Sequence, residues 1–304
     1  MQYIRSSEFQ LHDSAVALGK FEGIHRGHQL LLNELKKEKA HGLQSVVFTF
    51  DMPPKAAIHG DKSYSQIFTK AERRLFLERQ GMDVMLEHPF TKEFAALTPE
   101  EFIEEVLVKK VDARVVVVGS DFHFGKKRSG SVASLRAGAE KYGFRLIVKD
   151  KIQDQGRDIS STRIRELIEY GKMEEASGLL GRNYSIYGEV VHGKALGRTI
   201  QIPTMNQIVE DVKLVPPNGV YVSLVHIGDQ TYHGVTNIGT KPTVESERIK
   251  GIETHIFDYD GDLYGQMVEV ELLHFRRAEL RFHSVEELKK QMQADIVYAK
   301  NYLR

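Results

Sequence analysis

The chain has 304 residues, a length typical of two domains, and its 42 Lys and Arg balance its 42 Asp and Glu. Zero net charge argues against a general nucleic-acid binder, and the lack of cysteine excludes disulfides, cysteine-zinc sites and thiol catalysis. The first residues lack the layout of a signal peptide, and the longest apolar runs are too short to cross a bilayer. We therefore expect a soluble cytoplasmic protein without a membrane partner.

Up to about Leu180, short apolar strands alternate with helix-like stretches. The expected strands are Ala15–Leu18, Ser45–Phe50, Val84–Leu86, Arg114–Val118 and Phe144–Val148. The expected helices are Gly27–Ala40, Thr69–Gln80, Pro99–Lys109 after a Thr98 cap, Val132–Tyr142, one from Ser160 or Ser161 to about Tyr170, and Glu174–Leu180. This alternation predicts an α/β domain with a parallel sheet, helices on both faces, and ligands at the carboxyl ends of the strands.

After Gly181 the pattern changes to short strands separated by Gly, Pro and Asp turns. The expected strands are Ser185–His192, Gly219–Ile227, Gln230–Ile238, Glu253–Phe257 and Met267–Phe275. Evenly spaced strands of this kind predict a small barrel or sandwich. Ser284 then caps a final helix that runs to about Tyr302.

The segment Gly19–His28 follows the first expected strand and opens the first expected helix. Glycines let backbone amides approach a phosphate, and a helix N-terminus adds donors and a favourable dipole. His25 and His28 are three residues apart, so both can lie on one side of the first turn and donate to the phosphates of ATP. A bare pair at this spacing is more often solvated or part of a core, so the interpretation depends on its context.

The second motif is Ile159–Arg165, where Ser161 and Thr162 stand at a helix start and Arg165 lies one turn after Thr162. By itself this pattern is also that of a capped surface helix with solvated arginines. Combined with the two histidines, its hydroxyls, amides and arginine predict a clamp for the β and γ phosphates.

These two motifs resemble the HxGH and STxxR signatures of the nucleotidyltransferase superfamily. The surrounding residues resemble the prokaryotic bifunctional riboflavin kinase/FAD synthetase family, and residues 46–54 and 119–130 resemble its second-strand segment and flavin-site loop. The resemblance covers nearly the whole chain. It implies a Rossmann-like nucleotidyltransferase domain over residues 1–182, and a six-stranded antiparallel β-barrel with a terminal helix, resembling riboflavin kinase, over residues 183–304.

For the first domain, the resemblance implies transfer of AMP from ATP to FMN, which yields FAD, with Mg²⁺ on the triphosphate and His25, His28 and Arg165 as catalytic residues. The attacking phosphate is already anionic, so the protein has to align two anions and neutralise charge rather than supply a strong base. The implied ATP-binding residues are Gly19, Lys20, Phe21, Gly23, His25, His28, Ser161, Thr162 and Arg165. The implied flavin-binding residues are Phe50, Asp121, Phe122, Phe124 and Arg128, of which Phe122 and Phe124 could instead be core residues.

For the second domain, the resemblance implies phosphorylation of riboflavin to FMN. Glu253 would be the base that takes the proton of the ribityl hydroxyl, and Thr204 and Asn206 would bind Mg²⁺. The remaining implied residues are Gly193, Gly197 and Arg198 for ATP and Arg277 and Glu279 for the flavin. The implied partners are small molecules, namely ATP, FMN and riboflavin, and the oligomeric state stays open.

Several residues depart from the family pattern. Glu22 stands where the family usually has Asp in the first domain. In the barrel, Leu196 stands where the family usually has Gly or Arg, Gln201 where it has Gly, Ile202 where it has an aromatic residue and Met205 where it has Ala. The barrel is therefore either a working kinase with unusual packing or a degenerate module that keeps its fold and binds or senses flavin. Two further alternatives are an adenylyltransferase for a pantetheine or nicotinate phosphate, and a regulatory flavin-binding protein in which both sites are remnants.

Overall fold

The computed structural model describes residues 1–50, 65–193, 201–242 and 248–304. These residues form two compact units, Met1–Ser161 and Thr162–Arg304. From Thr162 onward, helices α7 (Ser161–Glu169) and α8 (Met173–Leu180) thus belong to the same unit as the barrel. The functional boundary at 182/183 stays a prediction. Within the described ranges, no helix is long and apolar enough to cross a membrane.

The first unit is built on a parallel sheet with the strand order β1-β4-β3-β2-β5-β6. Its strands are β1 (Gln2–Ile4), β2 (Ser14–Leu18), β3 (Gln44–Phe50), β4 (Val84–His88), β5 (Ala113–Gly119) and β6 (Arg145–Lys149), followed by a small hairpin of β7 (Gln153–Asp154) and β8 (Arg157–Asp158). The expected parallel sheet is confirmed.

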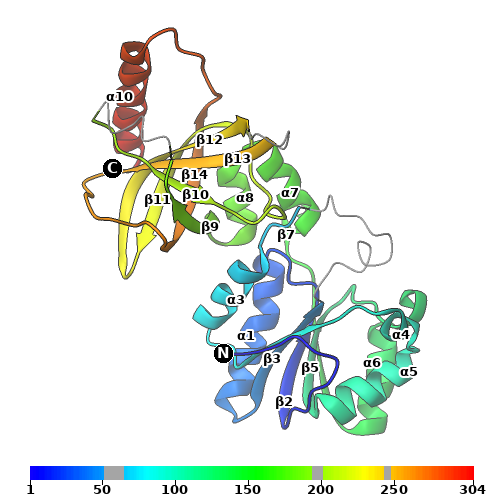
Figure 1. Ribbon diagram of the computed structural model, residues 1–304. Coiled ribbons are helices and arrows are strands. Elements are labelled where there is room, and N and C mark those ends of the chain that lie inside the picture. Colours follow the sequence, from blue (N-terminus) through cyan, green and yellow to red (C-terminus); the bar gives the residue numbers. More distant parts are fainter. Residues whose placement is uncertain (51–64, 194–200, 243–247) are drawn as a thin grey trace. The chain divides into compact units, whose positions relative to one another are not determined.

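Helices cover both faces of this sheet (Figure 1). They are α1 (Arg26–Ala40), α3 (Lys70–Arg79), α4 (Lys92–Ala96), α5 (Pro99–Glu101), the π-helix η1 (Phe102–Lys110), the 3-10 turn η2 (Lys126–Arg128) and α6 (Val132–Tyr142). One hydrophobic cluster joins α1 and α3 to one face of the strands, and a second cluster joins η1 and α6 to the other. These two apolar layers explain why the strands are buried on both sides.

Helix α3 begins at Thr69 with a capping box formed with Glu72, and α5 begins at Thr98 with a capping box formed with Glu101. The Thr98 cap agrees with the sequence, but the helix that follows does not stay α-helical. After Glu101 the chain continues as a π-helix to Lys110, which keeps Phe102, Ile103, Val106 and Leu107 buried against the sheet.

Strand β2 lies between β3 and β5. After β2 the chain adds β3 and β4 on one side of it and then β5 and β6 on the other. Such a reversal opens a crevice at the carboxyl ends of the central strands, where open α/β sheets bind their ligands. The turn that begins at Gly19 leaves β2 at this edge, and the loop that begins at Ser120 leaves the neighbouring β5. The topology therefore places the two motif-bearing loops of this unit side by side.

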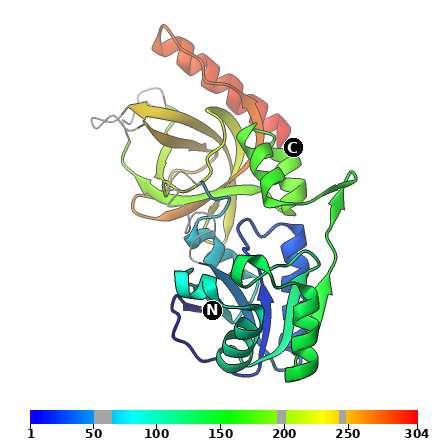
Figure 2. The ribbon, with the colours of Figure 1, turned by 90° about the vertical axis from the view of Figure 1, so that its right-hand side faces the viewer.

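The second unit contains a closed barrel of six antiparallel strands in the order β10-β13-β12-β11-β14-β9. These strands are β9 (Tyr184–Val191), β10 (Met205–Ile208), β11 (Gly219–Ile227), β12 (Gln230–Pro242), β13 (Arg248–Ile256) and β14 (Met267–Arg277). Helix α10 (Val285–Tyr302), the long red helix in Figure 2, buries Ala299 against Val222 and Phe257 of the barrel. The six-stranded barrel with a terminal helix is confirmed.

Candidate active sites

The turn between β2 and α1 is strained and firmly anchored. Phe21 and Ile24 have φ angles of 45° and 41°, which are unusual for an aromatic and a β-branched residue. Both side chains are fully buried in the cluster beneath α1. A Cβ on Gly23 would come within 2.9 Å of Cγ2 of Ile67, so this close approach requires glycine. Strain of this kind concentrates at functional sites. Because the Phe21 side chain is fully buried, the predicted contact of this residue with ATP would have to involve its backbone.

His25 and His28 lie together at the start of α1. His25 is the N-cap residue and is buried, and its ring stacks on that of His28 with 3.9 Å between ring centroids. The ring of His28 also contacts the buried ring of Phe21 at 5.0 Å. The two imidazoles thus stand where the helix dipole and the first-turn amides favour an anion.

The loop after β5 is closed by a pair of backbone hydrogen bonds between Phe124 and Gly130. Phe124 is buried in the core cluster next to the ring of Phe102, whereas Phe122 is half-buried and stacks on Phe124 at 5.6 Å. Of the two predicted flavin contacts, Phe124 has the surroundings of a core residue, and Phe122 is the more accessible ring.

The tip of this loop is a cationic turn made of Lys126, Lys127 and Arg128, all exposed. Lys127 and Arg128 have φ angles of 52° and 60°, which cost about 1–2 kcal/mol per residue. Within the described residues, the guanidinium of Arg128 makes no hydrogen bond or ion pair. A strained, exposed arginine is suited to pair with a phosphate.

Asp121, at the start of the same loop, forms an ion pair with Lys151, which lies between β6 and the β7–β8 hairpin. The ammonium of Lys151 lies 3.0 Å from carboxylate oxygens of both Asp121 and Asp158. The hydrogen bonds to these two carboxylates raise the pKa of Lys151. Asp121 is therefore oriented at the carboxyl edge of the sheet, but it is mostly exposed.

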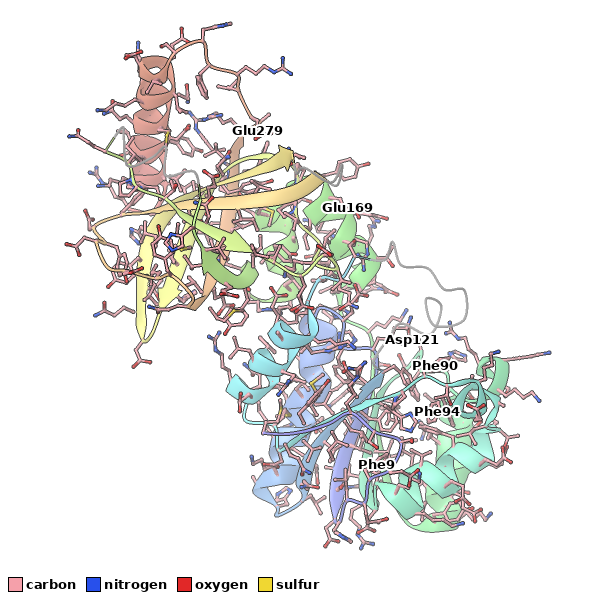
Figure 3. All side chains as sticks on the ribbon, in the orientation of Figure 1. Phe9, Phe90, Phe94, Asp121, Glu169 and Glu279 are labelled. Atoms are coloured by element: carbon pink, nitrogen blue, oxygen red, sulfur yellow. The ribbon has the colours of Figure 1, made fainter. Side chains whose placement is uncertain are left out.

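Around the predicted flavin contact Phe50, the structure adds aromatic residues that the motifs do not include, among them Phe90 and Phe94 (Figure 3). Phe50 at the end of β3 contacts Phe90 at 5.0 Å and Phe94 at 5.6 Å, and Phe94 lies 4.3 Å from the ring of His88. All four lie at or just beyond the carboxyl ends of β3 and β4. The sequence feature that could have indicated Phe90 and Phe94 is their position, four residues apart, soon after an apolar strand.

Ser161, Thr162 and Arg165 are located in the first turns of α7, as expected. The helix buries Ile164 and Ile168, while Thr162 is exposed and Arg165 is half-buried. Because α7 belongs to the second unit from Thr162 onward, the meeting of Arg165 with the two histidines stays a prediction.

The barrel brings three polar residues into one row. The strand register pairs Asn206 of β10 directly with Glu253 of β13, and Glu253 with Asn237 of β12. Directly paired residues have Cβ atoms about 4.5–5.5 Å apart on the same face. Thr204 precedes β10 by one residue, and its place on this face stays a prediction. The predicted metal ligand Asn206 and the predicted base Glu253 thus share one face of the barrel wall.

Gly193 fits against the amide of Asn206. A Cβ at position 193 would lie 2.2 Å from Nδ2 and 2.7 Å from Oδ1 of Asn206, which is buried at 7% exposure. Gly197, Arg198 and Leu196 lie outside the described residues.

Of the departures from the family pattern, Met205 is structurally compatible with a working site, whereas Gln201 is strained. Met205 pairs with the buried Thr254, on the opposite face of β10 from Asn206, so its bulk does not come between the predicted metal ligands. Gln201 has a φ of 62°, the left-handed conformation for which glycine is suited, and therefore carries backbone strain. Ile202 is buried.

Arg277 and Glu279 lie at the end of β14. The guanidinium of Arg277 forms an ion pair with the buried Asp295 of α10, with 2.6 Å between Nη2 and Oδ2. Glu279 accepts a hydrogen bond from Asn218, and a Cβ on Gly239 would meet its carboxylate at 2.5 Å. Arg277 thus has a clear structural role, and flavin contacts by either residue stay predictions.

A Gly193→Ala substitution should displace the Asn206 amide and lower any reaction at the barrel by at least about tenfold, which corresponds to ~1.4 kcal/mol. The matched control is Gly178→Ala in α8, because a Cβ there meets nothing within 4 Å. It should leave the rate unchanged and stabilise the helix slightly. Steady-state rates and thermal midpoints of both variants check this, and equal rates would contradict the role given to Asn206.

Two family models match the chain, "FAD synthetase" over residues 7–163 and "Riboflavin kinase" over residues 180–303. The bifunctional riboflavin kinase/FMN adenylyltransferase of Haemophilus influenzae is 35% identical, and the alignment covers 99% of each chain. The protein of the same name from Escherichia coli K12 is 36% identical over 94% of this chain and 92% of its own. A crystal structure from Streptococcus pneumoniae, of a protein called a macrolide-efflux protein, matches 99% of each chain with 34% identity and a TM-score of 0.88.

Proposed function

The chain belongs to the bifunctional riboflavin kinase/FMN adenylyltransferase family, and from this premise we propose which residues carry the two reactions. The protein converts riboflavin to FMN at the barrel and FMN to FAD in the first unit, with ATP as the donor in both steps. Because both reactions consume ATP, we place them in the cytoplasm.

One observation carries the assignment of the first unit: two stacked imidazoles at the start of α1, directly after a strained glycine-containing turn. There an FMN phosphate oxygen attacks the α-phosphorus of ATP and pyrophosphate leaves. Amides of the turn, together with His25 and His28, neutralise the charge that builds on the leaving pyrophosphate. Arg165 is proposed to bind the β and γ phosphates.

The flavin is proposed to bind beside the loop after β5 and the aromatic residues at the ends of β3 and β4. Phe122 and Phe50 offer half-buried rings for the isoalloxazine, and Phe90 and Phe94 extend that apolar wall. Arg128 at the strained cationic turn is proposed to pair with the FMN phosphate.

At the barrel, the carboxylate of Glu253 is proposed to accept the proton of the ribityl hydroxyl as that oxygen attacks the γ-phosphorus of ATP and ADP leaves. The support is the register that places Glu253 opposite Asn206 and Asn237. A hydroxyl is a weak nucleophile without a base, which explains why this reaction needs a carboxylate and adenylyl transfer does not.

The donor set at the barrel fits Mg²⁺. The hydroxyl of Thr204 and the amide oxygen of the buried Asn206 are hard oxygen donors two residues apart in the sequence. A bound Mg²⁺ supplies neutralisation of the triphosphate charge. Within the described residues no three His, Asp or Glu side chains gather as a metal cage, which agrees with an ion held largely by nucleotide phosphates.

Separation of flavins after incubation with ATP and Mg²⁺ tests the two assignments independently. We expect FMN and FAD from riboflavin, and FAD from added FMN. FAD from FMN with no product from riboflavin would reject the kinase and leave a lone adenylyltransferase. No product from either flavin would reject both assignments and favour a flavin-binding protein.

A further inference from the structure

A buried ion pair lies beneath the turn between β2 and α1. Arg73 of α3 places Nη2 2.6 Å from Oε1 of Glu87 in β4, and the two side chains are 7% and 0% exposed. The hydroxyl of Tyr3 donates to the other carboxylate oxygen at 2.5 Å, which fixes the orientation of Glu87. Buried ion pairs rarely add net stability compared with apolar residues of the same size. Stability alone therefore does not account for the pairing of Arg73 with Glu87.

The other end of the Arg73 guanidinium reaches the turn itself. Its Nη1 donates to the carbonyl oxygen of Lys20 at 3.3 Å, and the hydroxyl of Thr49 in β3 donates to the same oxygen at 2.9 Å. The Lys20 side chain is exposed, so its main chain rather than its ammonium group is held from beneath. Two donors from two different elements therefore fix this one carbonyl.

Fixing a carbonyl also aims the next amide, because the peptide group is planar and trans. With the oxygen of Lys20 turned toward Thr49 and Arg73, the N–H of Phe21 points the opposite way. The same device recurs along the turn: the carbonyl of Glu22 accepts from the amide of Phe68 at 3.2 Å. Amides presented in this way form an anion-binding concavity.

The conformation that results is strained. The φ of 45° at Phe21 is one that an aromatic residue rarely adopts, so the Lys20–Phe21 peptide keeps its orientation only while its surroundings hold it. Thr49 and Arg73 are the two side chains that hold its carbonyl.

We propose that Arg73, braced by Glu87, is a positioning residue for adenylyl transfer that holds the Lys20–Phe21 peptide in the orientation that binds the phosphates of ATP. This inference rests on the proposed function of the first unit. Arg73 touches no reacting atom in this role, and its effect passes through the backbone. Thr49 shares the role, because its hydroxyl donates to the same carbonyl oxygen.

The test uses the full-length protein and separates positioning from stability. Arg73→Met alone takes the closest cation from the buried carboxylate of Glu87 and leaves it only Lys70, whose Nζ lies 3.8 Å from Oε2, so it should lose stability as well as activity. The double variant Arg73→Met/Glu87→Leu removes that poorly compensated charge and should recover most of the thermal midpoint. It should still raise the KM for ATP in FAD formation by about tenfold, with a smaller change in kcat. The KM for ATP in riboflavin phosphorylation should stay unchanged.

A second pair of variants tests the same peptide without touching the ion pair. Thr49→Val keeps the shape but removes the hydroxyl, and it should raise the KM for ATP in FAD formation several-fold. Thr49→Ser keeps the hydroxyl and should restore the wild-type KM. The inference would be overturned if the Arg73→Met/Glu87→Leu and Thr49→Val proteins both fold and both keep the wild-type KM for ATP in FAD formation. A wild-type protein that makes no FAD from FMN would reject the proposed function itself, and the inference with it.

Discussion

Replacing His28 with alanine should lower the kcat/KM for FAD formation from FMN by about 10²–10³, the usual effect of losing one donor to a developing anion. His28 stands in the first turn of α1, where its ring stacks on His25 and touches Phe21. Its removal takes away the proposed donor to the leaving pyrophosphate and also the ring that stacks on His25. Flavin separation with saturating ATP measures the effect.

The same preparation provides the internal control, because riboflavin phosphorylation at the barrel should be unaffected by His28→Ala. A matched variant is His41→Ala, since His41 is the C-cap residue at the far end of the same helix and is exposed. It should keep full FAD formation. A folded His28→Ala protein that makes FAD at the wild-type rate would show that His28 has no part in the reaction.

Replacing Glu253 with glutamine should lower FMN formation from riboflavin by about 10²–10⁴, the range attributed to a general base. Glutamine keeps the size and one oxygen acceptor of Glu253, so the row with Asn206 and Asn237 should persist. The loss should therefore appear in kcat rather than in the KM for ATP. Rates of riboflavin phosphorylation, with FAD formation from added FMN as the unaffected reference, provide the measurement.

Glu189→Gln is the matched control for this variant. Glu189 lies on β9 of the same barrel and is exposed, and its strand partners are Ile208 and Met267 rather than the polar row. It should keep wild-type rates for both products. If Glu253→Gln phosphorylates riboflavin as fast as Glu189→Gln does, the base must be sought elsewhere.

The regular parts of the fold could be predicted from the sequence because their signals are local. Apolar runs such as Ser45–Phe50 show buried strands, and the Thr98 cap with Glu101 marks a helix start. Strand β1 has no such signal, because Gln2–Ile4 is only three residues long. It is held by parallel pairing with Val84–Leu86, about eighty residues later in the chain.

The motif residues lie on the elements that the sequence predicts, but their side-chain environments could be seen only in the structure. For Phe124 the sequence left both a flavin contact and a core position open, and the structure packs it among core residues, where the bridge to Gly130 folds the loop back on itself. From the sequence, Met205 is a larger residue between two predicted metal ligands and was expected to disturb the metal site. Strand alternation instead turns its side chain to the opposite face from Asn206.

The contact between Arg73 and the carbonyl of Lys20 was beyond sequence reasoning altogether. Its partners are 53 residues apart, and one of them is a main-chain atom, which no residue type reveals. Glu87 similarly looks like an interruption in an apolar strand until its pairing with Arg73 is seen. Long-range polar contacts of this kind leave no periodic trace in the sequence.

The central claim is that one chain uses two ATP molecules at two different phosphorus atoms, and isotopic labelling tests it most directly. With riboflavin, Mg²⁺ and ATP labelled at the γ-phosphate, we expect label in both FMN and FAD. With ATP labelled at the α-phosphate, we expect label in FAD and none in FMN. FMN that carries the α-label, or FAD that lacks it, would contradict this use of two ATP molecules.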